Sequence, residues 1–217
     1  MKKILFLVSL LLVVGGCSNS QFKPNYENMQ VSDNGINGYS LDLRAYGKVG
    51  TEMINKIVKL DNYKNQEYKI INIDANVIAD EGQTEENILY ILKGKVYAED
   101  DKGKYIEDTK NTKYINSAIY LEGLKDVTGV SGPKEKTVGE ATYDVYDVIF
   151  SKNNVKKIID DLEINGLELK DDVKGQIYLD KEGYVNSVIY NMETLTVNAN
   201  YYRINKATAI NFPAEIR

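Results

Sequence analysis

The sequence predicts an α+β domain built on an antiparallel sheet of eight or more strands. Short segments alternate between apolar and polar residues, and turn-forming residues separate them. The chain contains 17 tyrosines, and Tyr, Ile and Val favour strands. A single segment has clear helical spacing instead. Because large twisted sheets tend to curl or close, we expect this sheet to curl strongly.

The first half of the domain is predicted to be a series of strands. The first begins at Gly38, where residues 39, 41, 43 and 45 form the more apolar set. Lys93-Gly94-Lys95 and Asp101-Lys102-Gly103 have the composition of turns. The remaining strands are predicted at 54–60, 68–73, 88–92, 96–98 and 104–107. Residues 113–124 fit either a helix or a strand.

The second half is predicted to contain the helix and the final strands. Residues 129–139, with Gly132-Pro133, are predicted to form a loop. A strand is expected at 142–150, and Ser151 then suits the N-cap of a short helix. Val155, Ile158, Ile159 and Leu162 have helical spacing. Three more strands are predicted at 176–180, 184–192 and 195–204, followed by a short apolar tail at 210–213.

The N-terminus has the layout of a secretory signal. Lys2 and Lys3 precede an apolar stretch, residues 4–14, which only Ser9 interrupts. This stretch is shorter than the roughly 20 residues that a membrane-spanning helix needs. The first 16 residues are therefore predicted to be a signal peptide that is removed on export.

The end of this signal resembles the lipobox of bacterial prolipoproteins, through Val14, Gly15, Gly16 and Cys17. The resemblance implies cleavage before Cys17 and a diacylglyceryl group on its thiol. Two acyl chains give stable attachment to a membrane. The alternative is an ordinary signal peptide with a chance cysteine, but Cys17 is the only cysteine in the chain. We expect a lipidated cysteine and flexible tether at 17–37 and one domain at 38–217, on the extracytoplasmic face of the cell membrane.

Composition argues against most catalytic and metal sites. The chain has no histidine, and lipidation would consume its one thiol, so the usual nucleophile–base pairs and zinc ligands are missing. Three adjacent Asp-Asp pairs occur, but neighbouring side chains diverge on strands and helices alike. The pairs are Asp100-Asp101, Asp160-Asp161 and Asp171-Asp172. We therefore expect no enzyme, cofactor or metal site; a carboxylate-only glycosidase is a formal alternative. The chain is acidic and has no basic patch, which argues against nucleic acid as a partner.

The order of elements in the second half is similar to that of the LolA/LppX-like lipoproteins. The similarity rests on five features: the Gly-Pro loop, the strand 143–150, the helix after Ser151, the hairpin 178–185 and the closing segment 211–216. It implies an unclosed, half-barrel sheet with one or a few short helices in or against its concave face. It also implies a lipid or other hydrophobic ligand.

Eight residues of alternating strands are candidates to line an apolar cavity: Leu41, Leu43, Tyr143, Val145, Val188, Tyr190, Val197 and Tyr201. The alternative is an ordinary sheet core. The predicted function is that of a non-enzymatic carrier or sensor of a hydrophobic ligand. The alternative function is an envelope protein–protein interaction or assembly module whose core is filled by its own side chains.

Overall fold

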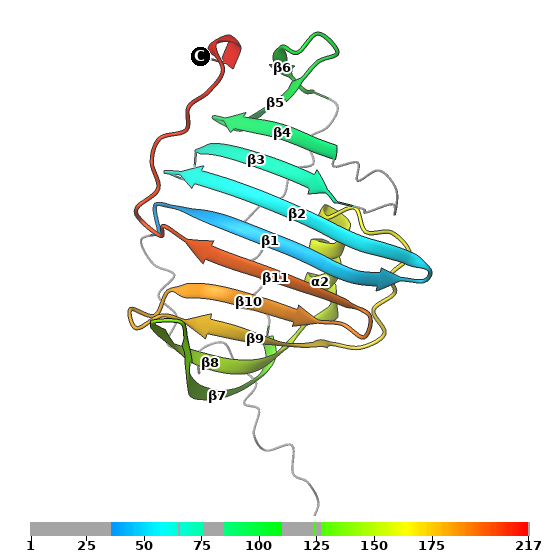
Figure 1. Cartoon of the computed structure of the whole chain (residues 1–217), viewed down its shortest axis with the longest axis vertical. Coiled ribbons are helices and arrows are strands. Elements are labelled where there is room, and N and C mark those ends of the chain that lie inside the picture. The colour runs from blue at the N-terminus through cyan, green and yellow to red at the C-terminus, as the bar shows by residue number, and fades with distance from the viewer. Residues whose placement is uncertain (1–35, 65, 76–84, 110–123, 125–126, 217) are drawn as a thin grey trace, which may run out of the picture.

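The computed structural model describes residues 36–64, 66–75, 85–109, 124 and 127–216 (Figure 1). The predicted signal peptide, the lipobox with Cys17 and most of the tether lie outside the described residues, as does 113–123 of the ambiguous segment. Within the described ranges, no helix has the length and apolar character needed to span a membrane.

The domain is one antiparallel sheet of eleven strands with one described α-helix, so it is mostly β. The helix is α2 (Lys152–Asp161), and a short 3₁₀ turn, η3 (Ala214–Ile216), ends the chain. The strands are β1 (Gly38–Val49), β2 (Glu52–Tyr63), β3 (Glu67–Asp74), β4 (Glu85–Leu92), β5 (Lys95–Glu99), β6 (Tyr105–Glu107), β7 (Val127–Val138), β8 (Ala141–Phe150), β9 (Val173–Leu179), β10 (Val185–Asn191) and β11 (Leu195–Tyr202).

The chain enters the sheet at its centre and returns there. The strand order is β6-β5-β4-β3-β2-β1-β11-β10-β9-β8-β7, so the first half runs from the centre to one edge. The second half starts at the other edge and runs back, which brings β11 beside β1 (Figure 1). The edge strands β6 and β7 do not pair with each other, and the sheet is therefore open, as the resemblance to the LolA/LppX-like lipoproteins implies.

The predicted hairpin between β4 and β5 is confirmed. Its two-residue loop is Lys93-Gly94, and both residues have positive φ, 52° and 80°. Two central residues with positive φ give a turn whose twist matches that of the flanking strands. Glycine reaches this conformation without strain, which is why a Gly-centred polar turn predicts a hairpin.

The prediction of a loop at residues 129–139 is wrong, because this segment belongs to the edge strand β7. The pairing of β7 with β8 shifts register between Ser131 and Lys134, on either side of Gly132-Pro133. Proline has no N–H for a sheet, but an edge strand needs only one row of hydrogen bonds. A bulge at the Gly-Pro pair therefore interrupts the strand without ending it.

One face of the sheet carries the main hydrophobic cluster, and we call it the inner face. In β1 it carries Leu41, Leu43 and Ala45, each with 0% exposure. The buried residues of α2, among them Val155 and Ile158, belong to the same cluster, and the helix lies behind the central strands in Figure 1. Ser151 occupies the N-cap position as predicted, but its side chain makes no capping hydrogen bond.

The opposite, outer face carries a second and smaller hydrophobic cluster at the β4–β6 end. The C-terminal segment crosses to this end (Figure 1) and places Phe212 and Ile216 against Tyr90. The ring of Tyr90 lies 5.7 Å from that of Phe212 and 5.0 Å from that of Tyr105. The predicted apolar tail is thus part of a core that covers the outer face of β4.

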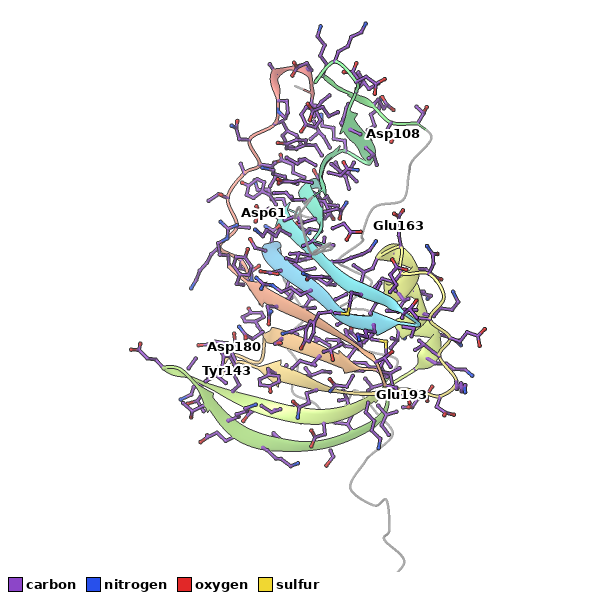
Figure 2. All side chains as sticks on the ribbon, turned by 45° about the vertical axis from the view of Figure 1, so that its right-hand side comes forward. Asp61, Asp108, Tyr143, Glu163, Asp180 and Glu193 are labelled. Carbon is purple, nitrogen blue, oxygen red and sulfur yellow. The ribbon has the colours of Figure 1, made fainter. Side chains whose placement is uncertain are left out.

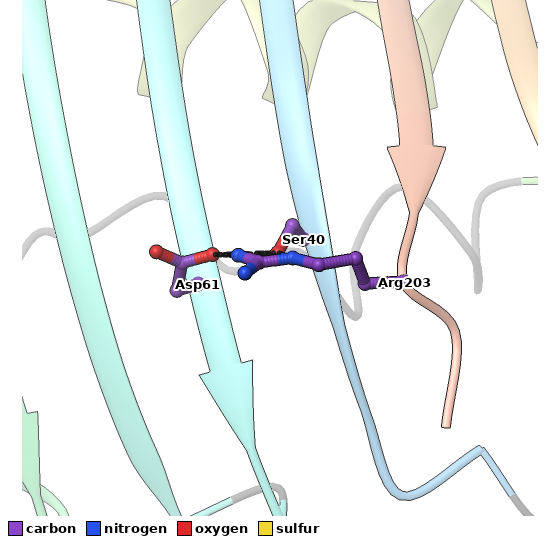
Figure 3. A network of polar contacts seen from close by, with 3 residues as sticks. All are labelled: Ser40, Asp61 and Arg203. Carbon is purple, nitrogen blue, oxygen red and sulfur yellow. Dashed lines mark hydrogen bonds and ion pairs between the residues drawn. The ribbon is translucent and has the colours of Figure 1, made fainter. Parts of the chain in front are cut away.

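A polar network holds the start of this C-terminal segment (Figure 3). Arg203, directly after β11, donates hydrogen bonds to Ser40 Oγ of β1 from Nε at 2.9 Å and from Nη2 at 2.5 Å. The same Nη2 contacts Asp61 Oδ1 of β2, and Ser40 donates to that oxygen. One arginine thereby connects β1, β2 and the exit of β11.

Replacing Arg203 with alanine is expected to lower the free energy of unfolding by about 1 kcal/mol, because the buried Ser40 hydroxyl loses two donors. The ion pair itself is half-exposed and adds little. Amide hydrogen exchange should become faster over residues 203–216. Arg44→Ala is the matched control, since the partner of Arg44 among the described residues is Asp42 on its own strand. Equal effects of the two substitutions on stability and exchange would contradict this role.

A candidate ligand-binding face

Strand register gathers six of the eight predicted cavity residues on the inner face. Directly opposite residues of antiparallel strands point to the same face of a sheet. Leu41 lies opposite Tyr201, and Leu43 lies opposite Ala199, which in turn lies opposite Val188. The six residues are between 0% and 2% exposed: Leu41, Leu43, Val188, Tyr190, Val197 and Tyr201. They form a continuous apolar surface across β1, β11 and β10.

The structure does not bring Tyr143 and Val145 to this surface, which corrects the prediction for these two residues. Val145 lies opposite Tyr178, whereas the neighbouring Ile177 lies opposite Val188 of the inner face. The Tyr143 ring packs edge-on against Tyr178 at 6.2 Å. Figure 2 shows Tyr143 beside the lower strands, near the β8–β7 edge. Both residues therefore lie on the outer face.

Polar contacts around Tyr178 fit this outer position. Lys136 Nζ donates to the Tyr178 hydroxyl at 2.9 Å, and that hydroxyl donates to Gln176 Oε1 at 3.2 Å. Gln176 in turn donates to Asp147, which also accepts from Lys134. These hydrogen bonds, that of Gln176 first, hold the pKa of Asp147 below its usual range. This part of the outer face is a water-facing polar chain and does not suit an apolar ligand.

The inner face of β8 is made by residues that sequence reasoning did not single out, Tyr146, Val148 and Phe150. Phe150 packs against Tyr190 with ring centroids 4.4 Å apart and planes tilted by 42°. Gly175 of β9 makes this contact possible. A Cβ at position 175 would lie 2.6 Å from Phe150 Cε2 and 2.0 Å from the Ile189 carbonyl oxygen. A glycine inside a strand often marks such close approach, and that signal was present in the sequence.

The hydroxyl of Tyr190 is a buried polar group within this apolar surface. Tyr190 is 1% exposed, and its hydroxyl finds no hydrogen-bond partner in the part of the chain that the structure describes. Burial raises the pKa of Tyr190 far above its usual range, so the group stays protonated and remains a donor. Its position is set by Phe150, whose strand leads directly into α2 through Ser151.

Two solved structures resemble this chain over most of its length. LprF from Mycobacterium bovis aligns with 88% of this chain and 94% of its own, with a TM-score of 0.58 and 8% identity. The lipoprotein LppX from Mycobacterium tuberculosis aligns with 82% of this chain and 91% of its own, with a TM-score of 0.51 and 11% identity. The chain has the LolA/LppX-like fold. No family model and no curated protein matches the sequence.

Within this LolA/LppX-like sheet, the inner face carries polar residues at one corner, near the start of β2 and the end of β3. Val58, Leu60 and Ile70 on the same face belong to the main hydrophobic cluster. Lys56 lies opposite Ala45 on one side and Asp74 on the other, which places both charged residues on the inner face. Lys56 Nζ and Asp74 Oδ2 are 3.5 Å apart. Asn72 Oδ1 and Asp74 Oδ1 are buried and accept no hydrogen bond from other described residues. The LolA/LppX-like inner face is thus apolar across most of its strands, with a polar corner at Lys56, Asn72 and Asp74.

The same described part of the chain contains no group of three or more His, Cys, Asp or Glu residues that could hold a metal ion. The described residues of the LolA/LppX-like inner face offer apolar contact, with a few hydrogen-bonding groups at defined positions.

Proposed function

We propose that this protein is a lipid-anchored extracytoplasmic lipoprotein that carries or senses a lipid or another hydrophobic ligand, without catalysis. The observation that carries the proposal is the continuous apolar inner face, whose hydrophobic cluster also includes the buried residues of α2. The structures of LprF and of the lipoprotein LppX share the fold and support the class. The ligand would lie between α2 and the inner face.

The low intrinsic stability of α2 supports the idea that a ligand could replace the apolar contacts of this helix. The helix has ten residues, no side-chain cap, no acidic residue in its first turn and no basic residue in its last. Isolated helices of this length are marginal in water, so α2 depends on the packing of its apolar side. An acyl chain offers about 0.8 kcal/mol for each buried CH₂ group and would replace those contacts.

The proposal includes the architecture expected from the sequence. Residues 1–16 would be removed, Cys17 would hold the acyl chains, and residues 17–37 would connect them to the domain at 38–217. Lipidation would keep the domain at the membrane, the source of apolar ligands. The net charge of the chain is −5, which gives no attraction to anionic headgroups, so the acyl chains would be the main attachment.

The test is native mass spectrometry of the mature chain carrying Cys17→Ala, purified without detergent from a bacterial host. This substitution leaves every described residue in place. The expected result is a reproducible additional mass that organic extraction identifies as lipid. The extracted protein should regain the mass when lipid is added back. A clean apo mass with no shift on adding fatty acids or phospholipids would count against the proposal.

The second candidate is a protein–protein interaction or assembly module with a filled core. The observation that favours it is the low exposure of the inner face, where Leu41, Val188 and Val197 are all at 0%. For this candidate we expect the apo mass in every preparation, together with the same envelope protein in repeated in-cell crosslinking. Lipid release on extraction would instead favour the carrier or sensor.

A further inference from the structure

We propose that the Tyr190 hydroxyl is the hydrogen-bond donor that recognises the ligand, and that it binds the carbonyl oxygen of an ester group. The inference rests on the proposed function and deepens it, because it names the ligand as an acyl ester and not as a hydrocarbon alone. The site consists of Tyr190 on β10, Phe150 on β8 and Gly175 on β9.

Burying the Tyr190 hydroxyl without a hydrogen-bond partner is energetically unfavourable. Buried polar groups in proteins nearly always have a hydrogen-bond partner, and leaving one without a partner destabilises the fold. Phenylalanine would fill the same space without that penalty. Tyr190 lies in the middle of the apolar surface, opposite Val197, with Val188 two residues away on the same strand. Among the described residues its hydroxyl has no partner, and a ligand atom is the partner we infer.

The ring is held so that the hydroxyl occupies a defined position. Phe150 packs at 4.4 Å on one side, and Gly175 leaves the room that this packing requires. Phe150 is also the last residue before Ser151 and α2. Tyr190 thus contacts the last residue of the strand that leads into α2, so a ligand bound on the inner face near the start of α2 would lie close to Tyr190.

The properties of the Tyr190 hydroxyl indicate which kind of ligand atom can accept its hydrogen bond. A phenol that stays protonated donates one hydrogen bond, and an ester carbonyl oxygen accepts one without bringing a charge into an apolar site. An ionised carboxylate would lose its hydration there, at a much greater cost. A neutral acyl ester fits the site better than a free fatty acid, and an alkane lacks the acceptor.

The test compares two ligands and two variants in the mature Cys17→Ala chain. The ligands are a long-chain fatty acid methyl ester and an n-alkane of matched length, and each is titrated by displacement of a fluorescent apolar probe. The wild-type domain is expected to bind the ester about 5-fold more tightly than the alkane. Tyr190→Phe should remove this preference and leave alkane binding unchanged. Tyr178→Phe is the matched control, because its hydroxyl lies on the outer face, and it should keep the preference.

The outcomes separate this inference from the function on which it rests. If neither ligand binds the wild-type protein, the proposed function fails. If both bind and Tyr190→Phe keeps the ester preference, only the assignment of Tyr190 is overturned. The thermal midpoint of the apo protein gives an independent measurement: Tyr190→Phe is expected to leave it unchanged or to raise it. A clearly lower midpoint would show that the hydroxyl serves a partner within the apo protein, and would also overturn the assignment.

Discussion

Cys17→Ala is expected to move the protein from the membrane fraction to the soluble fraction. The acyl chains on Cys17 would provide nearly all of the membrane affinity, since two chains anchor stably and an acidic domain has little attraction for anionic lipids. The expected change is from nearly complete retention to nearly complete release. Cell fractionation followed by immunoblotting measures it, with a high-salt wash to remove peripheral material.

Ser18→Ala is the control for this experiment, because it changes the next residue and leaves the cysteine in place. It should keep the protein in the membrane fraction. If Cys17→Ala protein stays in the membrane after the wash, another part of the chain holds it there, and the lipobox interpretation is incorrect. Mass spectrometry of the intact protein adds a direct check, since only the variants with Cys17 should carry the acyl mass.

Gly175→Ala is expected to lower the free energy of unfolding by about 3 kcal/mol, the upper end of the range for overpacking a core. The new Cβ would meet the Ile189 carbonyl oxygen at 2.0 Å. This atom belongs to the backbone of β10 and cannot rotate away, so the β9–β10 pair must shift. The Phe150 ring, 2.6 Å from the same Cβ, would move as well and loosen its contact with Tyr190. Chemical denaturation followed by circular dichroism measures the loss.

Gly139→Ala is the control that measures the cost of a left-handed backbone conformation without the cost of a steric clash. Gly139 has a φ of 63°, but nothing lies within 4 Å of a Cβ placed there. Alanine at position 139 is expected to cost about 1 kcal/mol through its left-handed backbone alone. A Gly175→Ala effect no larger than that of Gly139→Ala would mean that β9 and β10 accept the methyl group, and would weaken the link between Gly175 and the position of Tyr190.

The local elements of this fold could be predicted from the sequence because their signals are local. The alternation after Gly38 predicts β1, and the Lys93-Gly94 turn predicts the β4–β5 hairpin. The spacing of Val155, Ile158 and Ile159 predicts α2 and its buried side. The segment at 129–139 was misassigned because Gly-Pro is a strong loop signal, and its tolerance in a strand depends on that strand being an edge.

The candidate face could be predicted only in part, and β8 shows why. Its two alternating sets are nearly equal in apolar character: Tyr143, Val145, Asp147 and Ile149 against Asp144, Tyr146, Val148 and Phe150. A period of two says which residues share a face of a strand, but here it does not say which face is buried. The register with β9 decides it, because it places Tyr146 opposite the inner-face Ile177.

The sequence by itself predicted the export signal, the lipidation at Cys17, the strand-rich fold and three of the turns, at 93–95, at 101–103 and within 178–185. All of these depend on residues close together in the chain. Only the tertiary structure decided that β11 pairs with β1, that Phe150 lies across Gly175 against Tyr190, and that Tyr143 faces outward. These contacts join residues that are distant in sequence. They are selected by the free energy of burying two halves of a sheet together, which no local pattern encodes.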